Sequence, residues 1–118
     1  MKVPNVDRVI IPREKVVDYL LSETHPDGRP KAAFFARFGY VREFWETLTE
    51  TLRQHVTDHD VARTEDSPFG TRYVVEGIIT APDGRTPRLR SVWFIRTGEN
   101  TPWFVTAYPL PERLDDDS

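Results

Sequence analysis

The sequence lacks cysteine and has a single methionine among its 118 residues. The absence of cysteine excludes thiol catalysis, disulfide bonds and zinc or iron–sulfur centres with cysteine ligands. No apolar run is long enough to span a membrane, and residues 1–7 lack the hydrophobic stretch of a secretory signal peptide. We therefore expect a cytoplasmic protein that makes no membrane contact.

Specific catalytic motifs are also missing. The chain has no glycine-rich phosphate loop, no G-x-S-x-G, no H-E-x-x-H and no carboxylate pair followed by E-x-K. Asp58, His59 and Asp60 are three potential metal ligands, but adjacent side chains seldom converge on one ion. We expect neither a metal nor a cofactor.

The composition is that of one compact domain. With 38% hydrophobic and 12% aromatic residues, the chain can bury a core without disulfides or metal. A net charge of −3 disfavours a general nucleic-acid binder, yet residues 67–110 hold five arginines against three acids. We expect a single domain over residues 1–118, with a core from about 5 to 110 and an acidic tail at 111–118.

Hydrophobic periodicity predicts three helices in the first half of the chain. The first two cover Arg13–Ser22 and Lys31–Phe38, and a proline suits the first turn of each. The third, from about Val41 to Val56, has an apolar stripe at helical spacing. The polar stretch that follows, Thr57–Phe69, is predicted to be a loop because it contains Ser67-Pro68.

Residues after position 70 change to the alternation of β-strands. Runs rich in β-branched and aromatic residues cover Thr71–Thr80, Arg88–Thr97 and Trp103–Tyr108, and glycine-containing turns separate them. Val9–Ile11 is a candidate for a short additional strand. The sequence thus predicts an α+β fold in which three helices are followed by a three- to four-stranded antiparallel meander, with the helices on one face of the sheet.

Alternation along two of these strands collects basic and hydroxyl side chains on one face. In the middle strand Arg90 and Arg96 point to the same side, and in the last strand Phe104, Thr106 and Tyr108 share a side. This face is a candidate binding surface. The alternative interpretation is a half-solvated sheet face over which long arginine side chains lie.

The loop before the second predicted helix carries His25 and Lys31. It reads T-H-P-D-G-R-P-K, so a histidine and a lysine lie close to a helix N-terminus, which itself attracts anions. A phosphate site is one interpretation, and an ordinary loop histidine is the other. His55 lies in the last turn of the third predicted helix, where an imidazole favours the helix dipole, and we expect it to be structural.

Several segments resemble a bacterial domain family. The resemblance rests on Y-L-L-S-E-T-H-P-D-G-R-P-K-A-A-F-F-A-R-F-G at 19–39, G-T-R-Y-V-V-E-G at 70–77, V-W at 92–93 and P-W-F-V-T-A-Y-P at 102–109. Members of that family occur as small stand-alone proteins, some encoded beside a short partner, and as C-terminal modules of large secreted toxins. Helices that precede an antiparallel sheet are also similar to the barnase, EndoU, colicin and RelE class of metal-independent ribonucleases.

This resemblance implies RNA cleavage in which the neighbouring 2′-hydroxyl attacks phosphorus and leaves a cyclic phosphate, with no metal involved. His25 would act as acid or base, with Lys31 and Arg96 as cations on the phosphate, and Arg72 and Arg90 would make secondary substrate contacts. The implied partners are RNA and a small cognate antitoxin or immunity protein. The catalytic candidates are side chains that can donate, accept or carry positive charge: His25, Lys31, Arg96, Thr106 and Tyr108.

A noncatalytic module is the other hypothesis. Such a domain would use the sheet face, or an exposed sheet edge, to hold or inhibit a protein partner, because strand edges are ready templates for pairing. Catalysis predicts that His25, Arg96 and Thr106 converge in one cleft, whereas a binding module can leave them scattered.

Overall fold

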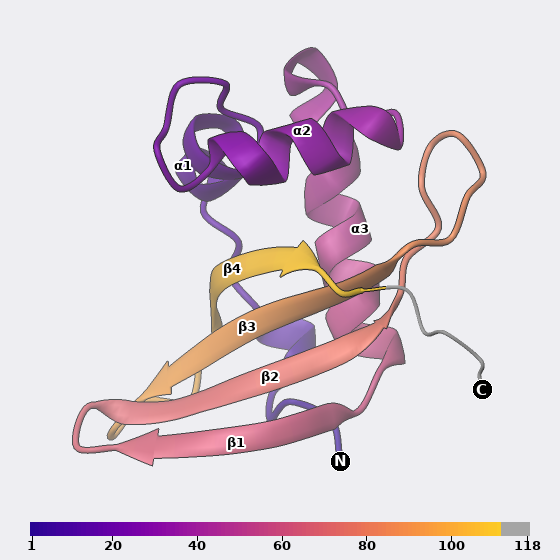
Figure 1. Cartoon of the computed structure of the whole chain (residues 1–118). Helices are drawn as coiled ribbons and strands as arrows, with labels where there is room; N and C mark the ends of the chain where they lie inside the picture. Colours follow the sequence, from indigo (N-terminus) through magenta and orange to yellow (C-terminus); the bar gives the residue numbers. More distant parts are fainter. Residues whose placement is uncertain (112–118) are drawn as a thin grey trace.

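In a computed structural model of the chain, residues 1–111 are described, and the predicted acidic tail lies outside them apart from Pro111. Three helices pack against one side of a four-stranded sheet (Figure 1). The helices are α1 (Arg13–Lys15), which continues as a π-helical turn (Val16–Leu20), α2 (Arg29–Arg37) and α3 (Trp45–Asp58), with 3-10 turns at Val6–Arg8 and Arg42–Phe44. The strands are β1 (Val61–Ser67), β2 (Gly70–Ile78), β3 (Arg88–Arg96) and β4 (Trp103–Pro109).

The α+β prediction with three helices and an antiparallel sheet is confirmed. Each strand pairs with the next along the chain, so the sheet order is β1-β2-β3-β4 and all three neighbouring pairs are antiparallel. Two residues connect β1 to β2, whereas the connections from β2 to β3 and from β3 to β4 are longer loops over residues 79–87 and 97–102. Helix α3 crosses behind the middle of this sheet in Figure 1.

The prediction that Thr57–Phe69 is a loop was wrong. Helix α3 continues through Asp58, and β1 occupies most of the remaining stretch. Every residue of β1 after Val61 is exposed, since the strand lies at the edge of the sheet and its second half extends beyond the helices. A strand with two wet faces has no apolar alternation, so the polar sequence concealed it.

The short N-terminal strand is also not formed. Ile10 makes only one isolated parallel bridge, to Trp103, through hydrogen bonds to Pro102 and Phe104 of the β4 segment. This bridge closes the outer edge at the start of β4. Val9 beside it is buried in the core, which explains the apolar signal at this position.

A β-bulge changes the expected faces of β4. The register shifts between Val92 and Trp93 of β3, so Val105 has no direct partner while Thr106 pairs with Val92 and Phe104 with Trp93. Phe104 is therefore buried in the core, and the prediction that it shares a face with Thr106 was wrong. Thr106 and Tyr108 stay on the side that simple alternation predicted.

The core lies between α3 and the inner face of the sheet. Trp93 and Leu48 are fully buried within it, and Phe34 and Trp45 pack half-buried against the same cluster. Full burial of such side chains stabilises the fold by roughly 1.5–3 kcal/mol each. Side chains of α1 with its π-helical turn, of α2 and of β4 all belong to this cluster, so the core holds these helices against β4.

The opposite side of the sheet carries a mixture of aromatic, basic and aliphatic side chains. Val74 and Val92 are buried at its centre outside the main core cluster, whereas Trp103 and Ile78 are exposed. We call this surface the open face, and its members on β2, β3 and β4 follow from the strand register. They are Arg72, Val74, Glu76 and Ile78 of β2, Arg88, Arg90, Val92, Phe94 and Arg96 of β3, and Trp103, Thr106 and Tyr108 of β4.

Candidate functional site

Tyr19, in the turn that continues α1, joins the helical layer to the end of β4. Its hydroxyl and the Thr106 hydroxyl are 2.9 Å apart and form a hydrogen bond. The ring of His25 meets the Tyr19 ring edge-on, with 5.1 Å between ring centres. Three residues from distant parts of the sequence are thus in contact, and one of them lies on the open face.

Two lysines approach the same tyrosine ring. Lys15 Nζ is 5.6 Å and Lys31 Nζ 5.3 Å from the Tyr19 ring centre, within the range of a cation–π interaction. Lys15 Nζ also donates to the Val105 carbonyl at 3.0 Å, so the bulged residue of β4 supplies an acceptor. We name Lys15, Tyr19, His25, Lys31 and Thr106 the Tyr19 cluster; all five are half-buried.

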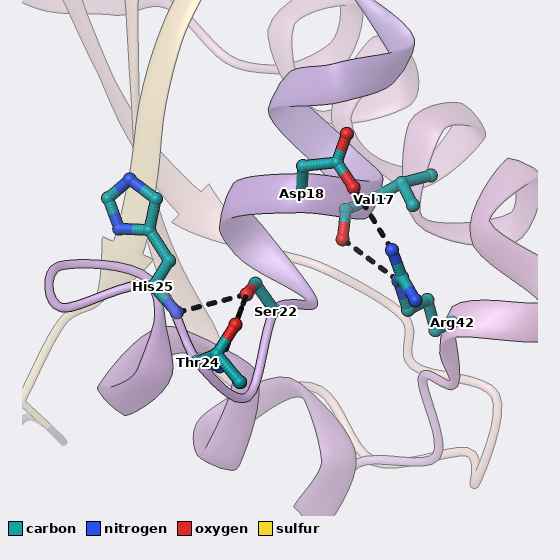
Figure 2. A network of polar contacts seen from close by, with 6 residues as sticks. All are labelled: Val17, Asp18, Ser22, Thr24, His25 and Arg42. Carbon is teal, nitrogen blue, oxygen red and sulfur yellow. Dashed lines mark hydrogen bonds and ion pairs between the residues drawn. The ribbon is translucent and has the colours of Figure 1, made fainter.

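The loop of His25 is held rigid by local hydrogen bonds. Ser22 Oγ accepts the backbone N–H groups of Thr24 and His25 at 3.2 and 3.0 Å (Figure 2). His25 Nδ1 accepts two more, from Asp27 at 3.0 Å and Gly28 at 3.1 Å. Because Nδ1 is an acceptor, the proton of the neutral ring resides on Nε2, which can donate to a ligand.

Gly28 is required by the close approach of two backbones. A Cβ at this position would lie 1.9 Å from the Tyr19 carbonyl oxygen, so no larger residue fits without movement. Two residues of the H-P-D-G sequence thus have clear structural roles. Gly28 lets the loop approach the backbone of Tyr19, and the His25 ring accepts hydrogen bonds from two N–H groups of the loop.

A groove of about 960 Å³ lies on the other side of this loop. Its far wall is fixed by Arg42, which donates to Asp18 at 3.0 Å and to the Val17 carbonyl at 3.2 Å. Figure 2 shows the His25 ring directed away from Arg42. The groove is lined by a mixture of apolar, polar and charged residues: Asp18, Leu21, Ser22, Glu23, Thr24, His25, Arg29, Ala32, Ala33, Ala36, Tyr40, Val41, Arg42 and Glu43.

Arg90 and Tyr108 lie next to one another on the open face. Arg90 donates to the Tyr108 hydroxyl at 3.2 Å, and its guanidinium is 5.4 Å from the Tyr108 ring centre. It also forms a close ion pair with Glu76, at 2.6 Å. The hydrogen bonds with Tyr108 and Glu76 raise the pKa of Arg90, so this arginine is charged but largely matched by Glu76.

The remaining two predicted arginines lie at the other end of the sheet. Arg96 pairs with Gly70, four residues along β3 from Val92, the partner of Thr106. At about 3.3 Å per residue this is roughly 13 Å along the strand. Arg72 pairs with Phe94 and lies 3.9 Å from Glu65. The structure thus places His25, Lys31 and Thr106 each in contact with Tyr19 and leaves Arg72 and Arg96 apart from this group.

His55 belongs to a buried network under the sheet, separate from the Tyr19 cluster. Its Nδ1 lies 2.9 Å from Ser91 Oγ, which accepts from Trp93 Nε1 at 2.8 Å, and its Nε2 lies 3.2 Å from the Gly77 carbonyl. The consistent arrangement is a neutral ring with the proton on Nε2. Burial, reinforced by the neighbouring His59, lowers the pKa of His55 to about 4.

Lys15 and Tyr19 are functional candidates that the sequence analysis missed. They are four residues apart at the start of the chain's first helical segment, so they share one side of it. Both residues were included only within the first predicted helix, Arg13–Ser22. A basic residue four positions before a tyrosine, on the helix nearest to the histidine loop, was the signal that could have found them.

These features define a class of protein: an α+β domain with a basic and aromatic cluster where its first helix meets one edge of an antiparallel sheet. Within that class the chain belongs to a particular family, because the family model described as domain of unknown function DUF6883 matches residues 2–111. A comparison with curated proteins gives no match. None of the helices in residues 1–111 has the length and apolar character needed to cross a membrane.

A solved structure shares this fold. It is a chain from the contact-dependent growth inhibition toxin–immunity protein complex of Klebsiella pneumoniae 342, with a TM-score of 0.71 and 16% sequence identity. The similarity covers 86% of the present chain and 99% of the other. At this identity the likeness establishes a common fold and nothing more.

Proposed function

We propose that the protein is a metal-independent ribonuclease of bacterial toxin type, which cleaves RNA through attack of a 2′-hydroxyl on the adjacent phosphorus. The observation that carries the proposal is the Tyr19 cluster, in which two lysines, a histidine donor and two hydroxyls meet at the margin of the open face. The fold shared with a chain of a toxin–immunity complex supports the same class.

The cluster suits the charge that develops in this reaction. Attack of the 2′-oxygen forms a phosphorane whose nonbridging oxygens gain negative charge, and departure of the 5′-oxygen leaves a 2′,3′-cyclic phosphate. In our scheme Lys15, Lys31 and the Nε2–H of His25 bind these oxygens, together with the Thr106 hydroxyl. A hydroxide ion from solvent takes the proton of the 2′-hydroxyl, the 5′-oxygen takes a proton from the Lys31 ammonium, and the resulting amine regains a proton from water, which restores the hydroxide.

The role of His25 follows from its tautomer. A base would need a free ring nitrogen facing the substrate, but Nδ1 is occupied by two backbone N–H groups and Nε2 carries the proton. We therefore propose that His25 is a hydrogen-bond donor to the phosphate instead of a proton acceptor. Rigid placement of such a donor costs no reorganisation during the reaction, which is the condition for strong transition-state stabilisation.

The open face is the proposed platform for the rest of the RNA. Tyr108 lies two residues after Thr106 on the same side of β4 and accepts a hydrogen bond from Arg90, while Trp103 is exposed on the same strand. Aromatic rings of this kind stack on unpaired bases, and arginines contact phosphates or stack on base planes. Arg72 and Arg96, at the far end of the sheet, are suited to backbone contacts distant from the scissile bond.

The test is RNA cleavage by the purified protein in EDTA. We expect wild-type cleavage with a cyclic phosphate end, and a loss of about a hundredfold or more in Lys31→Gln, His25→Gln and Thr106→Val. Lys2→Gln is the matched control, since Lys2 is exposed and forms an ion pair with Asp60 at 3.6 Å, away from the Tyr19 cluster. Expression of the active form should slow bacterial growth, and a cognate immunity protein should relieve the effect.

Two outcomes would contradict the proposal. Intact RNA at high concentrations of folded protein, with no effect on growth, would favour the noncatalytic binding module. Cleavage that EDTA abolishes would indicate a metal-dependent reaction instead.

A further inference from the structure

The two edges of the sheet differ sharply. At the β4 edge, the backbone of Ile10 bonds to Pro102 and Phe104, and Lys15 binds the Val105 carbonyl. At the β1 edge, the Met1 carbonyl accepts the N–H of Val61 at 2.7 Å, and the side chains from Ala62 to Ser67 are exposed. The free part of this edge therefore starts at Ala62.

The hydrogen-bond pattern shows which backbone groups of β1 point outward. Phe69 and Ile79, at the two ends of β2, bond to Thr97 and Pro87 on the β3 side, so the odd-numbered residues of β2 face β3. Even-numbered residues of β2 consequently bond to β1, where Gly70, Arg72 and Val74 are opposite Ser67, Glu65 and Arg63. The N–H and C=O groups of Thr64 and Asp66 are left facing the free edge.

We propose that the free edge of β1 pairs with β1 of a second copy of this chain, antiparallel and centred on Thr64. With this centre, Thr64 faces its own copy as a hydrogen-bonded pair, which is what its outward N–H and C=O groups require. The register of β1 with β2 shifts between Val61 and Arg63, so the regular part of the free edge starts at Arg63. The segment from Arg63 to Glu65 is symmetric about Thr64, so this stretch of one copy covers the same stretch of the other.

Charge selects the same register. Centred on Thr64, each Arg63 lies opposite Glu65 of the other copy, and the pair occurs twice. A centre on Arg63, Glu65 or Asp66 would place two like charges directly opposite, which is destabilising in a sheet. Arg63 and Glu65 are each half-exposed on one strand face and 3.2 Å apart within the chain, so both are positioned to exchange partners across the two-fold axis.

The dimer would have a single eight-stranded sheet. A two-fold axis perpendicular to the sheet keeps the helices of both copies on one side and the open faces on the other. The β4 edges, with the Tyr19 clusters, then lie at the two outer ends and are not covered. This proposal does not depend on the proposed ribonuclease activity. A single pair of short strands buries little surface, so we expect a weak, concentration-dependent association.

The test is sedimentation equilibrium of the purified chain from about 10 µM to 1 mM, a range that covers weak interfaces. We expect the wild type to approach the dimer mass at the top of this range. Thr64→Pro should remain monomeric with an unchanged melting temperature, because the N–H that it removes points to the free edge and takes no part in the pairing of β1 with β2 within residues 1–111. Arg37→Glu, a charge reversal at an exposed position on α2, is the control and should dimerise as the wild type does.

Charge reversal tests the register itself. Arg63→Glu and Glu65→Arg should each weaken self-association by about tenfold or more, since both cross-strand pairs become like-charged. Mixing the two variants should restore association as a heterodimer, because every opposing pair is again of opposite sign.

Three results would overturn the proposal: a wild-type monomer at the highest concentration, a dimer that survives Thr64→Pro, or variants that stay monomeric when mixed. Circular dichroism melts of each variant separate loss of association from loss of folding.

Discussion

His55 should make the stability of the protein depend on pH in the mildly acidic range. In the folded chain burial holds its pKa at about 4, with His59 reinforcing the shift and Asp58 opposing it. In the unfolded chain an ordinary histidine has a pKa near 6.5. Below pH 6.5 the unfolded state therefore binds a proton that the folded state does not, and the free energy of unfolding falls as the pH is lowered toward 4.

The size of the effect follows from the two pKa values. A difference of about 2.5 units corresponds to about 3.4 kcal/mol once the pH is below both values. At pH 5 the unfolded imidazole is almost fully charged while the folded one is mostly neutral, so the loss relative to pH 8 is about 2 kcal/mol. For a domain whose total stability is about 5–15 kcal/mol, this is a measurable fraction.

The assay is urea unfolding at pH 8, 7, 6 and 5, followed by tryptophan fluorescence. His55→Gln keeps a donor that can reach the Gly77 carbonyl but cannot titrate, so it should be less stable at pH 8 and lose about 2 kcal/mol less than the wild type between pH 8 and 5. His25→Gln leaves the buried network intact and should keep the wild-type pH dependence. Equal losses in the wild type and His55→Gln, within about 0.5 kcal/mol, would refute the reasoning.

Three further predictions follow from close contacts. Gly28→Ala should destabilise the fold by about 1–3 kcal/mol, measured by urea unfolding, because its Cβ would collide with the Tyr19 carbonyl. Ser91→Ala should cost about 1–3 kcal/mol for each buried partner left unpaired, namely His55 Nδ1 and Trp93 Nε1, and a near-neutral result would show that the network contributes nothing. Tyr19→Phe should cost only about 0.5–1.5 kcal/mol of stability but reduce RNA cleavage, and unchanged cleavage would remove the Tyr19 hydroxyl from the proposed site.

Much of the architecture was predictable because its hydrophobic pattern is strong. The stripe of α3 and the alternation of β2 and β3 both reflect one apolar side facing the core, and each element formed close to its predicted range. Strand β1 was missed because exposure of both its faces removes the alternation. The bulge at Val105 could not be predicted either. The segment from Trp103 to Tyr108 fits a regular strand, and it contains no glycine that would mark an extra residue.

The candidate site was predictable only in part, because its members come together through tertiary packing. The T-H-P-D-G-R-P-K loop indicated His25 and Lys31 through local chemistry, a rigid turn before a helix. Nothing local connects that loop to Thr106, some eighty residues later in the chain. Arg96 was predicted to belong to the site because alternation along β3 puts it on the same face as Arg90. Alternation assigns a residue to a face of the sheet but does not say how far along the strand it lies from the other site residues.

The bulge at Val105 links the fold to the proposed site. Without it, Phe104 and Thr106 would point to the same side of β4, and either the core would lose a ring that packs 5.3 Å from Trp93 or Thr106 would be buried beside it. The extra residue turns Phe104 inward while Thr106 stays outward, within hydrogen-bond distance of Tyr19. It also exposes the Val105 carbonyl to Lys15. The extra residue Val105 thus allows Phe104 to pack in the core while Thr106 contacts the Tyr19 cluster. Bulges are common near functional sites, where they redirect side chains in this way.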